Sequence, residues 1–268
     1  MDEHDIPLLH HPLSEPSAFT ADALVDAVRS ERKLQVEAVP RVCVLEFDGD
    51  LTDWLVTTGR AKMCERWACF HTVMHIMDVG SDVCGIIART IGGPFTVLVA
   101  EQLRSSGAEL VLGLTSAGRV SPSLPLPSLV VVKDAIRDEG TSYHYLNPCN
   151  TVAADPKLVT ALADGIKPLG VSVSSGRVWT TDAPYRETQR QLDRYASEGV
   201  LAVEMQAASL LAFSKATGMP AGMVALVSNA VDHTDNAFNK GPHEFGLRLI
   251  ETMCMAGMRY LAGRKLRS

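Results

Sequence analysis

The sequence predicts an α/β protein whose centre is a largely buried mixed sheet. Three observations lead to this fold class. From residue 41 onward, short apolar segments alternate with longer segments of helical periodicity. The apolar segments are rich in Val, Ile and Leu and are bounded by Gly, Pro or Asp, as buried strands are. With 268 residues, of which 46% are hydrophobic and 21% charged, the chain can build one large core.

Each apolar segment is expected to form a strand, and each periodic segment a helix. The expected strands are 41–47, 67–78, 82–91, 109–115, 128–134, 169–175 and 219–227. The expected helices are 94–106, 155–166, 185–197, 204–217 and 239–262. Pro94 suits a first helical turn, and Gly107 and Gly218 suit helix ends. This alternation predicts a binding site at the C-terminal ends of the strands.

Residues 1–40 differ from the rest of the chain. They hold four of the 14 prolines and one helical stretch, Ala21 to Arg32, for which Thr20 is a suitable N-cap. We interpret them as an N-terminal arm that lies on the main domain or on a neighbouring subunit. Residues 41–268 are expected to form that single main domain.

Composition excludes several classes of protein. No apolar run approaches the roughly 20 residues that cross a bilayer, so no membrane association is expected. The acidic start MDEHDIPLLHH is unlike a secretory signal, and we expect a cytoplasmic protein. The six cysteines form no CxxC pair, which favours buried reduced thiols and no metal site. The net charge of −6 without a basic block argues against nucleic-acid binding.

Three segments that follow apolar strands carry groups suited to a ligand. The first, Leu114–Arg119, has small residues that let backbone N–H groups and hydroxyls approach a sugar or an anion, although it could be an ordinary tight turn. The second, Ser174–Glu187, contains Trp179, which suits a planar ring. The alternative is a helix entry in which Asp182 caps the helix and Trp179 packs in the core.

The third group of candidates lies at a helix start and after the next strand. Val203–Ser209 and Val227–Asp232 offer carboxylate and amide groups that could bind vicinal hydroxyls or a ring nitrogen. On its own, Glu204 is more often a partner of the helix dipole than a ligand.

Taken together, these segments resemble the purine and uridine phosphorylase family, which includes the hydrolytic methylthioadenosine nucleosidases. The resemblance runs from about Val42 to Leu261, and its motifs are modest one by one but specific in this order and spacing. They are IGGP with AEQL, then TSAG, WTTDAPYRET and VEMQA. The family fold implies a three-layer α/β/α sandwich around a mixed sheet, assembled from dimers. Its chemistry implies N-glycosidic cleavage through an oxocarbenium-like ribose, with phosphate or water as the nucleophile.

The resemblance also implies roles for individual residues. Those expected to line the ribose and nucleophile pocket are Gly49, Thr115, Ser116, Ala117, Gly118, Glu204, Met205 and Gln206. Trp179 is near the position of the aromatic residue that stacks on the base, and Asn229 aligns with the residue that faces the base. An N-terminal histidine of relatives can reach a neighbouring sugar site, which makes His10 and His11 candidates.

The departures from the family pattern concern the nucleophile. Phosphorylases have an arginine that clamps phosphate where this chain has Asp53, and a second where it has Gly113. The nucleosidases have a carboxylate at the first position, so Asp53 could be the general base for water. It could also be a solvated residue in the first turn of a helix. Four other arginines could supply phosphate contacts: Arg60, Arg89, Arg119 and Arg177.

Two further departures concern the substrate. Gln206 stands where the family has a glutamate that accepts hydrogen bonds from ribose hydroxyls, and an amide adds donors there. Asn229 stands where purine nucleosidases have an acid that protonates the base. Uridine or 6-oxopurine nucleosides are therefore expected rather than adenosine.

The sequence thus predicts a pentosyltransferase of the nucleoside phosphorylase type, with no cofactor except phosphate as a possible co-substrate. Two alternatives remain open. One is a phosphate-independent nucleosidase that uses Asp53. The other is a nucleoside-binding protein without turnover, which the combination of Gln206, Asn229 and the absent arginines motivates. A homo-oligomer built from dimers is implied by the resemblance alone.

Overall fold

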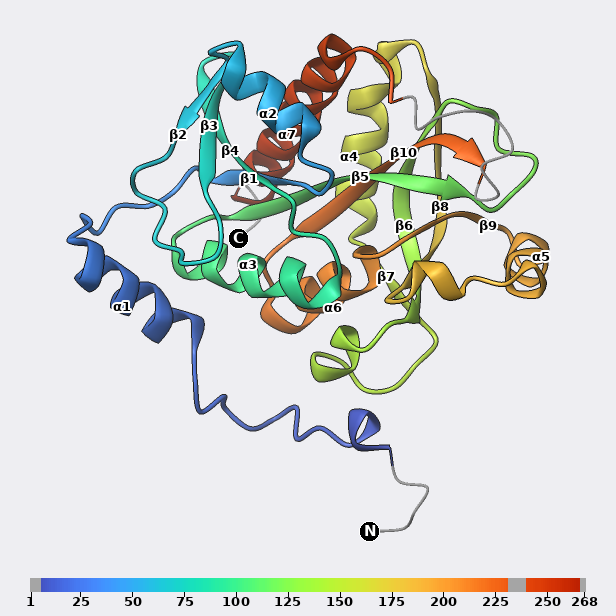
Figure 1. The fold of residues 1–268 in the computed structure, drawn as a ribbon, viewed down its shortest axis with the longest axis horizontal. Coiled ribbons are helices and arrows are strands. Elements are labelled where there is room, and N and C mark those ends of the chain that lie inside the picture. The colour runs from blue at the N-terminus through green and yellow to red at the C-terminus, as the bar shows by residue number, and fades with distance from the viewer. Residues whose placement is uncertain (1–5, 231–239, 266–268) are drawn as a thin grey trace.

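The computed structural model describes residues 6–230 and 240–265, and its centre is a ten-stranded mixed sheet (Figure 1). The strands are β1 (Val42–Glu46), β2 (Ala61–Met63), β3 (Met74–Val79), β4 (Asp82–Ala88), β5 (Leu110–Arg119), β6 (Ser128–Asp138), β7 (Thr151–Ala153), β8 (Ser172–Thr181), β9 (Val200–Glu204) and β10 (Ala221–Ala230).

Helices cover both faces of this sheet, which confirms the predicted α/β/α architecture. They are α1 (Ala21–Arg32), α2 (Asp50–Thr57), α3 (Gly93–Ser105), α4 (Pro156–Ile166), α5 (Gln189–Ser197), α6 (Ala207–Thr217) and α7 (His243–Lys265). Because side chains alternate along a strand, Leu45 and Phe47 pack in the core beneath α3 and α6, while Val42 and Val44 pack in the core beneath α4 and α7 (Figure 1).

The strand order brings four parallel strand ends to one edge of the sheet. β4, β1, β5 and β10 are parallel neighbours, so their C-terminal ends lie together. β5 pairs with β10 along its length and with β9 near its own C-terminal end. β10 pairs with β6, β6 with β8, and β8 with β9, so these five strands form a closed ring. The end of β9, where α6 begins, therefore lies beside the end of β5.

Long elements agree best with the predictions from sequence. Helix Ala21–Arg32 has the predicted bounds, and Thr20 caps it by accepting the Ala23 N–H at 3.2 Å. Helices α3, α4 and α7 also lie where periodicity placed them, within a few residues at each end.

Several short elements differ from the predictions. The sequence analysis missed β2, β7 and β9, and it anticipated α2 only as the alternative that places Asp53 in the first turn of a helix. The expected strand 67–78 is wrong over residues 67–73, which form no strand. Trp67, Ala68 and Cys69 are apolar because they are buried in the core, not because they pair in the sheet. The strand expected at 169–175 runs on to Thr181 as β8, so most of the Ser174–Glu187 segment is strand rather than loop.

Two helix starts are also corrected. The helix expected from residue 185 begins at Gln189, where Thr188 and Gln191 form a capping box. The helix expected from residue 204 begins at Ala207, because Glu204 is the last residue of β9.

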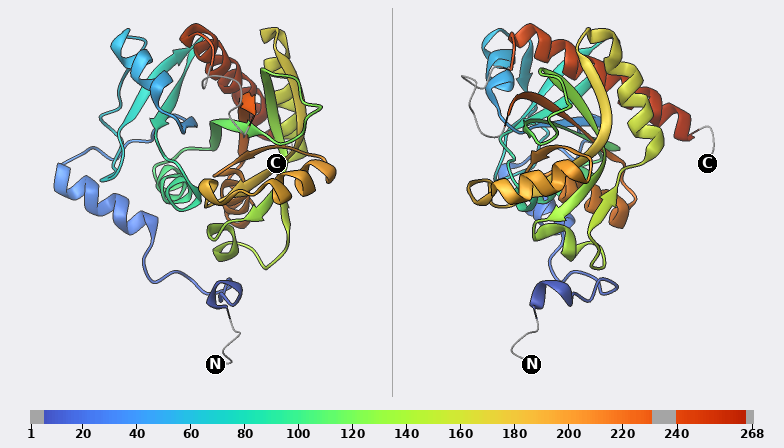
Figure 2. Two further views of the ribbon diagram at one scale, coloured as in Figure 1. Left: turned by 45° about the vertical axis from the view of Figure 1, so that its right-hand side comes forward. Right: turned by 90° about the vertical axis from the view of Figure 1, so that its right-hand side faces the viewer.

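The N-terminal segment lies on the outside of the main body, and its first part projects from it in both views of Figure 2. α1 packs through Val25 and Val28 against Ala68, and Arg32 donates to the Cys69 carbonyl at 2.9 Å. Farther out, the His11 ring lies over His144 of the same chain, with ring centroids 3.8 Å apart.

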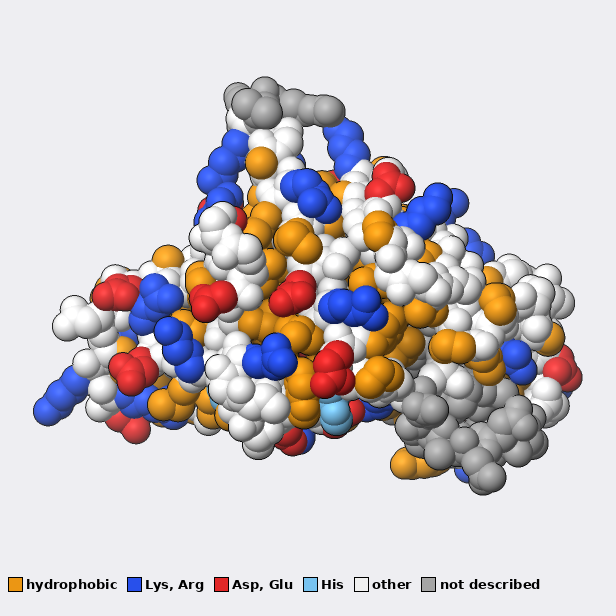
Figure 3. Space-filling view, turned by 90° about the horizontal axis from the view of Figure 1, so that it is seen from above, with side chains coloured by type: hydrophobic (Ala, Val, Ile, Leu, Met, Phe, Trp, Pro, Cys, Tyr) orange, Lys and Arg blue, Asp and Glu red, His pale blue; other side chains and the backbone are white. Residues whose placement is uncertain are grey.

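The surface carries mixed charge, and most of the cysteine thiols are buried. Within residues 6–230 and 240–265, no helix is both long and apolar enough to span a membrane. Basic and acidic side chains are interspersed over the face in Figure 3. All six cysteines are free thiols and five are buried, but Cys149 is exposed, which corrects the expectation for that residue.

Candidate active site

The pairing of β1 with β4 and with β5 continues past Glu46, the last residue of β1. Arg89 donates its N–H to the Glu46 carbonyl at 3.0 Å, and the Phe47 N–H bonds to the Leu114 carbonyl at 3.0 Å. Arg89 and Thr115 therefore flank the end of β1, about 10 Å apart given the strand spacing. The Asp48–Gly49 turn begins between them.

The Thr115–Gly118 segment is part of β5 rather than a turn. Its last residues pair with both neighbours, since Gly118 lies opposite Val203 of β9 and Asn229 of β10. The Thr115 hydroxyl lies 3.5 Å from Gln206 Oε1 and donates to the Ser116 carbonyl at 2.8 Å. The structure thus brings together two of the predicted ribose residues from segments 91 positions apart in the chain.

The junction of β9 and α6 is organised by Glu204. This carboxylate is 4% exposed and accepts from the Thr180 hydroxyl at 2.5 Å and from the Gln206 and Ala207 N–H groups at 2.6 and 2.8 Å. Burial raises the pKa of Glu204 to about 7. Glu204 therefore holds the start of α6, and the neighbouring residues rather than Glu204 itself are placed to face a ribose.

Gln206 is also buried, with 3% of its surface exposed. Its Oε1 accepts the Met205 N–H at 3.1 Å, so the side chain folds back on the loop that begins α6. Met205, by contrast, is partly exposed. Among Thr115, Met205 and Gln206, the methionine is thus the most accessible to a ligand.

A second group of predicted residues lies where β1 meets α2. Gly49 has φ +89°, and the Glu46 carboxylate accepts its N–H at 2.8 Å. The same carboxylate accepts the N–H and the hydroxyl of Thr52 at 3.1 and 2.9 Å. Glu46 is 3% exposed, and burial raises its pKa. Its two oxygens therefore occupy the hydrogen-bond donors of Gly49 and Thr52 at the start of α2.

Arg89 lies across this turn. Its φ of +62° is a left-handed conformation that costs a non-glycine residue roughly 1–2 kcal/mol. A Cβ on Gly49 would be 2.6 Å from Arg89 Cγ, so only glycine lets the arginine lie there. Of the four arginines considered for phosphate, Arg89 is thus in contact with the glycine turn, whereas Arg60 lies over the Trp54 ring and Arg177 pairs with Asp134.

Asp53 forms a bidentate ion pair with Arg89 in the first turn of α2. The two side chains are 59% and 54% exposed. The hydrogen bonds from Arg89 lower the pKa of Asp53. A carboxylate with a lowered pKa and both oxygens engaged is a weak general base, so this geometry favours an ion-pairing role.

Asp48 joins the turn to the ribose segment. Its carboxylate accepts the Ser116 hydroxyl at 2.8 Å and the Ser116 N–H at 3.1 Å. Lys240 lies 3.2 Å from Asp48 and 2.7 Å from Asp50. A cavity of about 40 Å³, which has room for water, lies between these residues, Thr115 and the start of α7.

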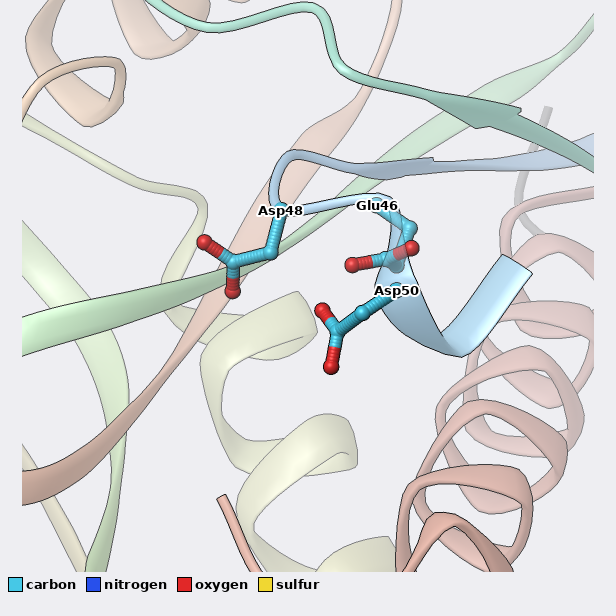
Figure 4. Close-up of side chains that lie close together, drawn as sticks. All are labelled: Glu46, Asp48 and Asp50. Carbon is cyan, nitrogen blue, oxygen red and sulfur yellow. The ribbon is translucent and has the colours of Figure 1, made fainter. Parts of the chain in front are cut away.

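Glu46, Asp48 and Asp50 are also the group that could hold a cation. Figure 4 shows their side chains together at the end of β1 and the start of α2, and one oxygen of each lies within 4.8 Å of the others. The ammonium group of Lys240 already supplies positive charge to two of these three carboxylates.

Packing explains why no arginine stands at position 113. A Cβ on Gly113 would lie 2.9 Å from the Phe47 ring and 3.1 Å from Met223 Cγ. Phe47 is 1% exposed, so its ring fills the space above Gly113. Sequence reasoning missed this role of Phe47 because it depends on which strands become neighbours.

Trp179 lies in the core, as the packing alternative anticipated. It is fully buried against Val200 and Val203, and its ring N–H donates to Asp138 at 2.9 Å. Asp182 does not cap α5 but accepts the Gly140 N–H at 2.8 Å. The packed ring leaves no face open to a base.

Two predicted positions are less fully placed. Asn229 is in β10, but its side chain is outside the described residues. The His11 ring lies against that of His144 in its own chain, and His10 precedes it on the same arm.

Residues that the sequence analysis did not single out are Glu46, Asp48 and Lys240. The signal for the first two was the run of four acids within Glu46–Asp53.

Comparison with known proteins gives a match to one family model over most of the chain. The model of the family described as the phosphorylase superfamily matches residues 57–262, beginning after the Glu46–Asp53 segment. A uridine phosphorylase of Thermococcus kodakarensis is 29% identical over 168 residues, or 58% of this chain and 60% of the relative. A guanosine phosphorylase of Halorubrum lacusprofundi is 27% identical over 148 residues, or 55% of this chain and 61% of the relative.

A further relative is the uridine phosphorylase of Escherichia coli. It is 27% identical over 154 residues, or 52% of this chain and 61% of the relative. The chain therefore spans 60–61% of the length of these three curated relatives.

Proposed function

Because the chain belongs to the phosphorylase superfamily, we propose that it cleaves the N-glycosidic bond of a nucleoside by transferring the ribosyl group to a nucleophile. The contact between Thr115 and Gln206 carries this proposal. It joins the C-terminal half of β5 to the start of α6, and β5 is the strand beside β1, which the Gly49 turn follows. The ribose would lie against Thr115, Ser116, Ala117, Gly118, Met205 and Gln206, and the nucleophile near Gly49.

The electrostatics of the site suit this chemistry. Breaking the bond between C1′ and the base places positive charge on the ribose. Asp48 lies beside Ser116, so a carboxylate is fixed on one side of the proposed ribose position. Fixed carboxylates that stabilise developing positive charge lower the barrier to bond breaking.

For the base, we propose uracil or a 6-oxopurine. The named relatives act on uridine and guanosine, and an amide at Asn229 can hydrogen-bond such a base but cannot protonate adenine as an acid. Trp179 takes no part in this proposal, since it is packed in the core.

Release of free base from a panel of nucleosides tests the proposed function. Uridine, inosine, guanosine and adenosine are each incubated with the full chain, with and without phosphate, and the products are separated by chromatography. Release of uracil or an oxopurine that exceeds release of adenine supports the proposal. Calorimetric binding of a nucleoside without any release would instead support a binding protein, the alternative that the amide of Gln206 motivates.

Assembly is also part of the proposal. The edge of the sheet at β2 exposes Met63 and the loop that precedes β3 exposes Phe70 and Val73, with exposed fractions of 61%, 44% and 52%. Large apolar side chains grouped at a sheet edge suit a subunit interface. We propose a homo-oligomer built from dimers, and light scattering at several protein concentrations would report its mass.

A further inference from the structure

We infer that the ribosyl acceptor at this site is water rather than phosphate, and that Glu46, Asp48 and Asp53 determine this preference. The inference rests on the proposed N-glycosidic cleavage. Each of the three carboxylates is bonded to a group that would otherwise be free to bind an incoming oxyanion. The chain thus fills its own anion-binding positions.

The start of α2 is the first such position. The N-terminus of a helix attracts anions because its first N–H groups have no partner within the helix. Here Glu46 accepts the N–H groups of Gly49 and Thr52 at 2.8 and 3.1 Å, from a side chain that is 3% exposed. A phosphate could reach these donors only by displacing a buried side chain of the same segment.

The ribose segment is the second position. Ser116 offers an N–H and a hydroxyl at the end of β5, and Asp48 accepts both, at 3.1 and 2.8 Å. Bonds to a charged acceptor are stronger than bonds to a neutral one. Phosphate would therefore have to displace the Asp48 carboxylate, which already balances the partial positive charge of the Ser116 N–H and hydroxyl groups.

Arg89 is the third position, and it is the cation in contact with Gly49. Asp53 holds its guanidinium through both carboxylate oxygens. Position 113, one strand away, has no room for a second guanidinium because Phe47 packs on it. Arg89 is therefore already paired with Asp53, and Phe47 leaves no room for a second arginine at position 113.

The balance of charge leads to the same conclusion. Within residues 6–230 and 240–265, the ion pairs at this acidic segment (Glu46, Asp48, Asp50 and Asp53) are made by two cations, Arg89 with Asp53 and Lys240 with Asp48 and Asp50. Even with Glu46 protonated, negative charges exceed positive ones. A phosphate dianion is repelled by such a surface, whereas water is not.

With water as the acceptor, the reaction balances without a further reactant. The water oxygen bonds to C1′ while the C1′–N bond breaks, and the bonding pair leaves with the base nitrogen. One proton of the water ends on the base, so the products are free base and free ribose.

The test combines product analysis with phosphate binding. Base release by the wild type is measured over a series of phosphate concentrations at constant ionic strength, and ribose is distinguished from ribose 1-phosphate by ³¹P NMR. In parallel, phosphate-induced shifts in Tm are measured for the wild type and for the Asp48→Asn/Asp53→Asn double variant. Glu109→Gln is the matched control, because it breaks the bidentate ion pair between Glu109 and Arg41. These two residues precede β5 and β1, so the pair lies at the opposite end of the same strands from the candidate site.

We expect phosphate-independent release of ribose by the wild type and no phosphate-induced Tm shift in the wild type or the control. The double variant should gain a shift of about 2 °C near saturation. Phosphate-dependent formation of ribose 1-phosphate would overturn the inference while supporting the proposed cleavage. Without any turnover, the cleavage proposal fails, and the Tm measurement still decides the phosphate question: a shift in the wild type, or none in the double variant, overturns the assignment.

Discussion

Asp53 and Arg89 form an exposed ion pair at the start of α2, and its chemistry can be tested by one substitution. We predict that Asp53→Asn lowers kcat in phosphate-free buffer by less than about tenfold, because a solvent-exposed carboxylate with a lowered pKa is a poor base. Loss of this surface pair should change the free energy of unfolding by less than about 1 kcal/mol. Steady-state kinetics and urea unfolding provide the two measurements. A loss of kcat of roughly 10²-fold or more would assign the general base to Asp53 after all.

Glu204 gives a prediction about pH. Its pKa is raised from 4.5 to about 7 by burial in the folded chain. Its contribution to stability is therefore full below its unfolded pKa and is lost as pH rises through about 7. The free energy of unfolding should fall by up to about 3 kcal/mol between pH 5 and pH 8 from this group.

Urea unfolding of Glu204→Gln at several pH values checks this prediction, since the variant should lack that part of the fall. Glu109→Gln is the control, because the pKa of Glu109 is lowered by its hydrogen bond from Arg41 and its contribution changes only at acidic pH. An unchanged pH dependence in Glu204→Gln would contradict the assignment.

Phe47 and Gly113 form a packing pair that a double-mutant cycle can measure. Gly113→Ala should cost about 1–3 kcal/mol, because the new Cβ would lie 2.9 Å from the Phe47 ring. In a Phe47→Ala background the same change should cost less than about 1 kcal/mol, since the ring is gone. Equal costs in both backgrounds would show that the ring does not determine which residue fits at position 113.

At the scale of elements, the start of α3 is fixed against α6 by a close approach at Gly93. A Cβ there would lie 2.2 Å from Ser209 Oγ and 3.0 Å from Thr141 Oγ1. We predict that Gly93→Ala separates the two helix starts and lowers the unfolding free energy by about 1–3 kcal/mol. Gly263→Ala in α7, which has nothing within 4 Å of its new Cβ, should be neutral or slightly stabilising. Similar losses of stability in both variants would argue against this contact.

Element length explains which parts of the fold could be predicted from the sequence. α1 has a capping threonine, Thr20, and apolar residues at helical spacing, of which Val25 and Val28 are buried, so its approximate bounds could be predicted. β2 and β7 have three residues each, which is too short for a period to be visible. Residues 67–73 were misassigned because Trp67, Ala68 and Cys69 are buried apolar residues in a loop, which have the same composition as a strand.

At the scale of the whole molecule, the sequence placed the ribose segment better than the nucleophile segment. Thr115 and Gln206 lie in the TSAG and VEMQA motifs, and the family resemblance assigns both motifs to the ribose pocket. The contact between the two side chains could therefore be expected. The roles of Glu46 and Phe47 depend on hydrogen bonds and on strand neighbours that no local pattern shows. Trp179 was assigned to the base from its chemical character, but an aromatic ring is as well suited to the core.

The account as a whole depends on cleavage of the bond between a nucleobase and its ribose. Chromatography of uridine and guanosine after incubation with the purified full chain in phosphate-free buffer measures this cleavage. We predict free uracil or guanine, with ribose in equal amount. If no free base appears from either nucleoside, with or without added phosphate, the proposed cleavage is contradicted.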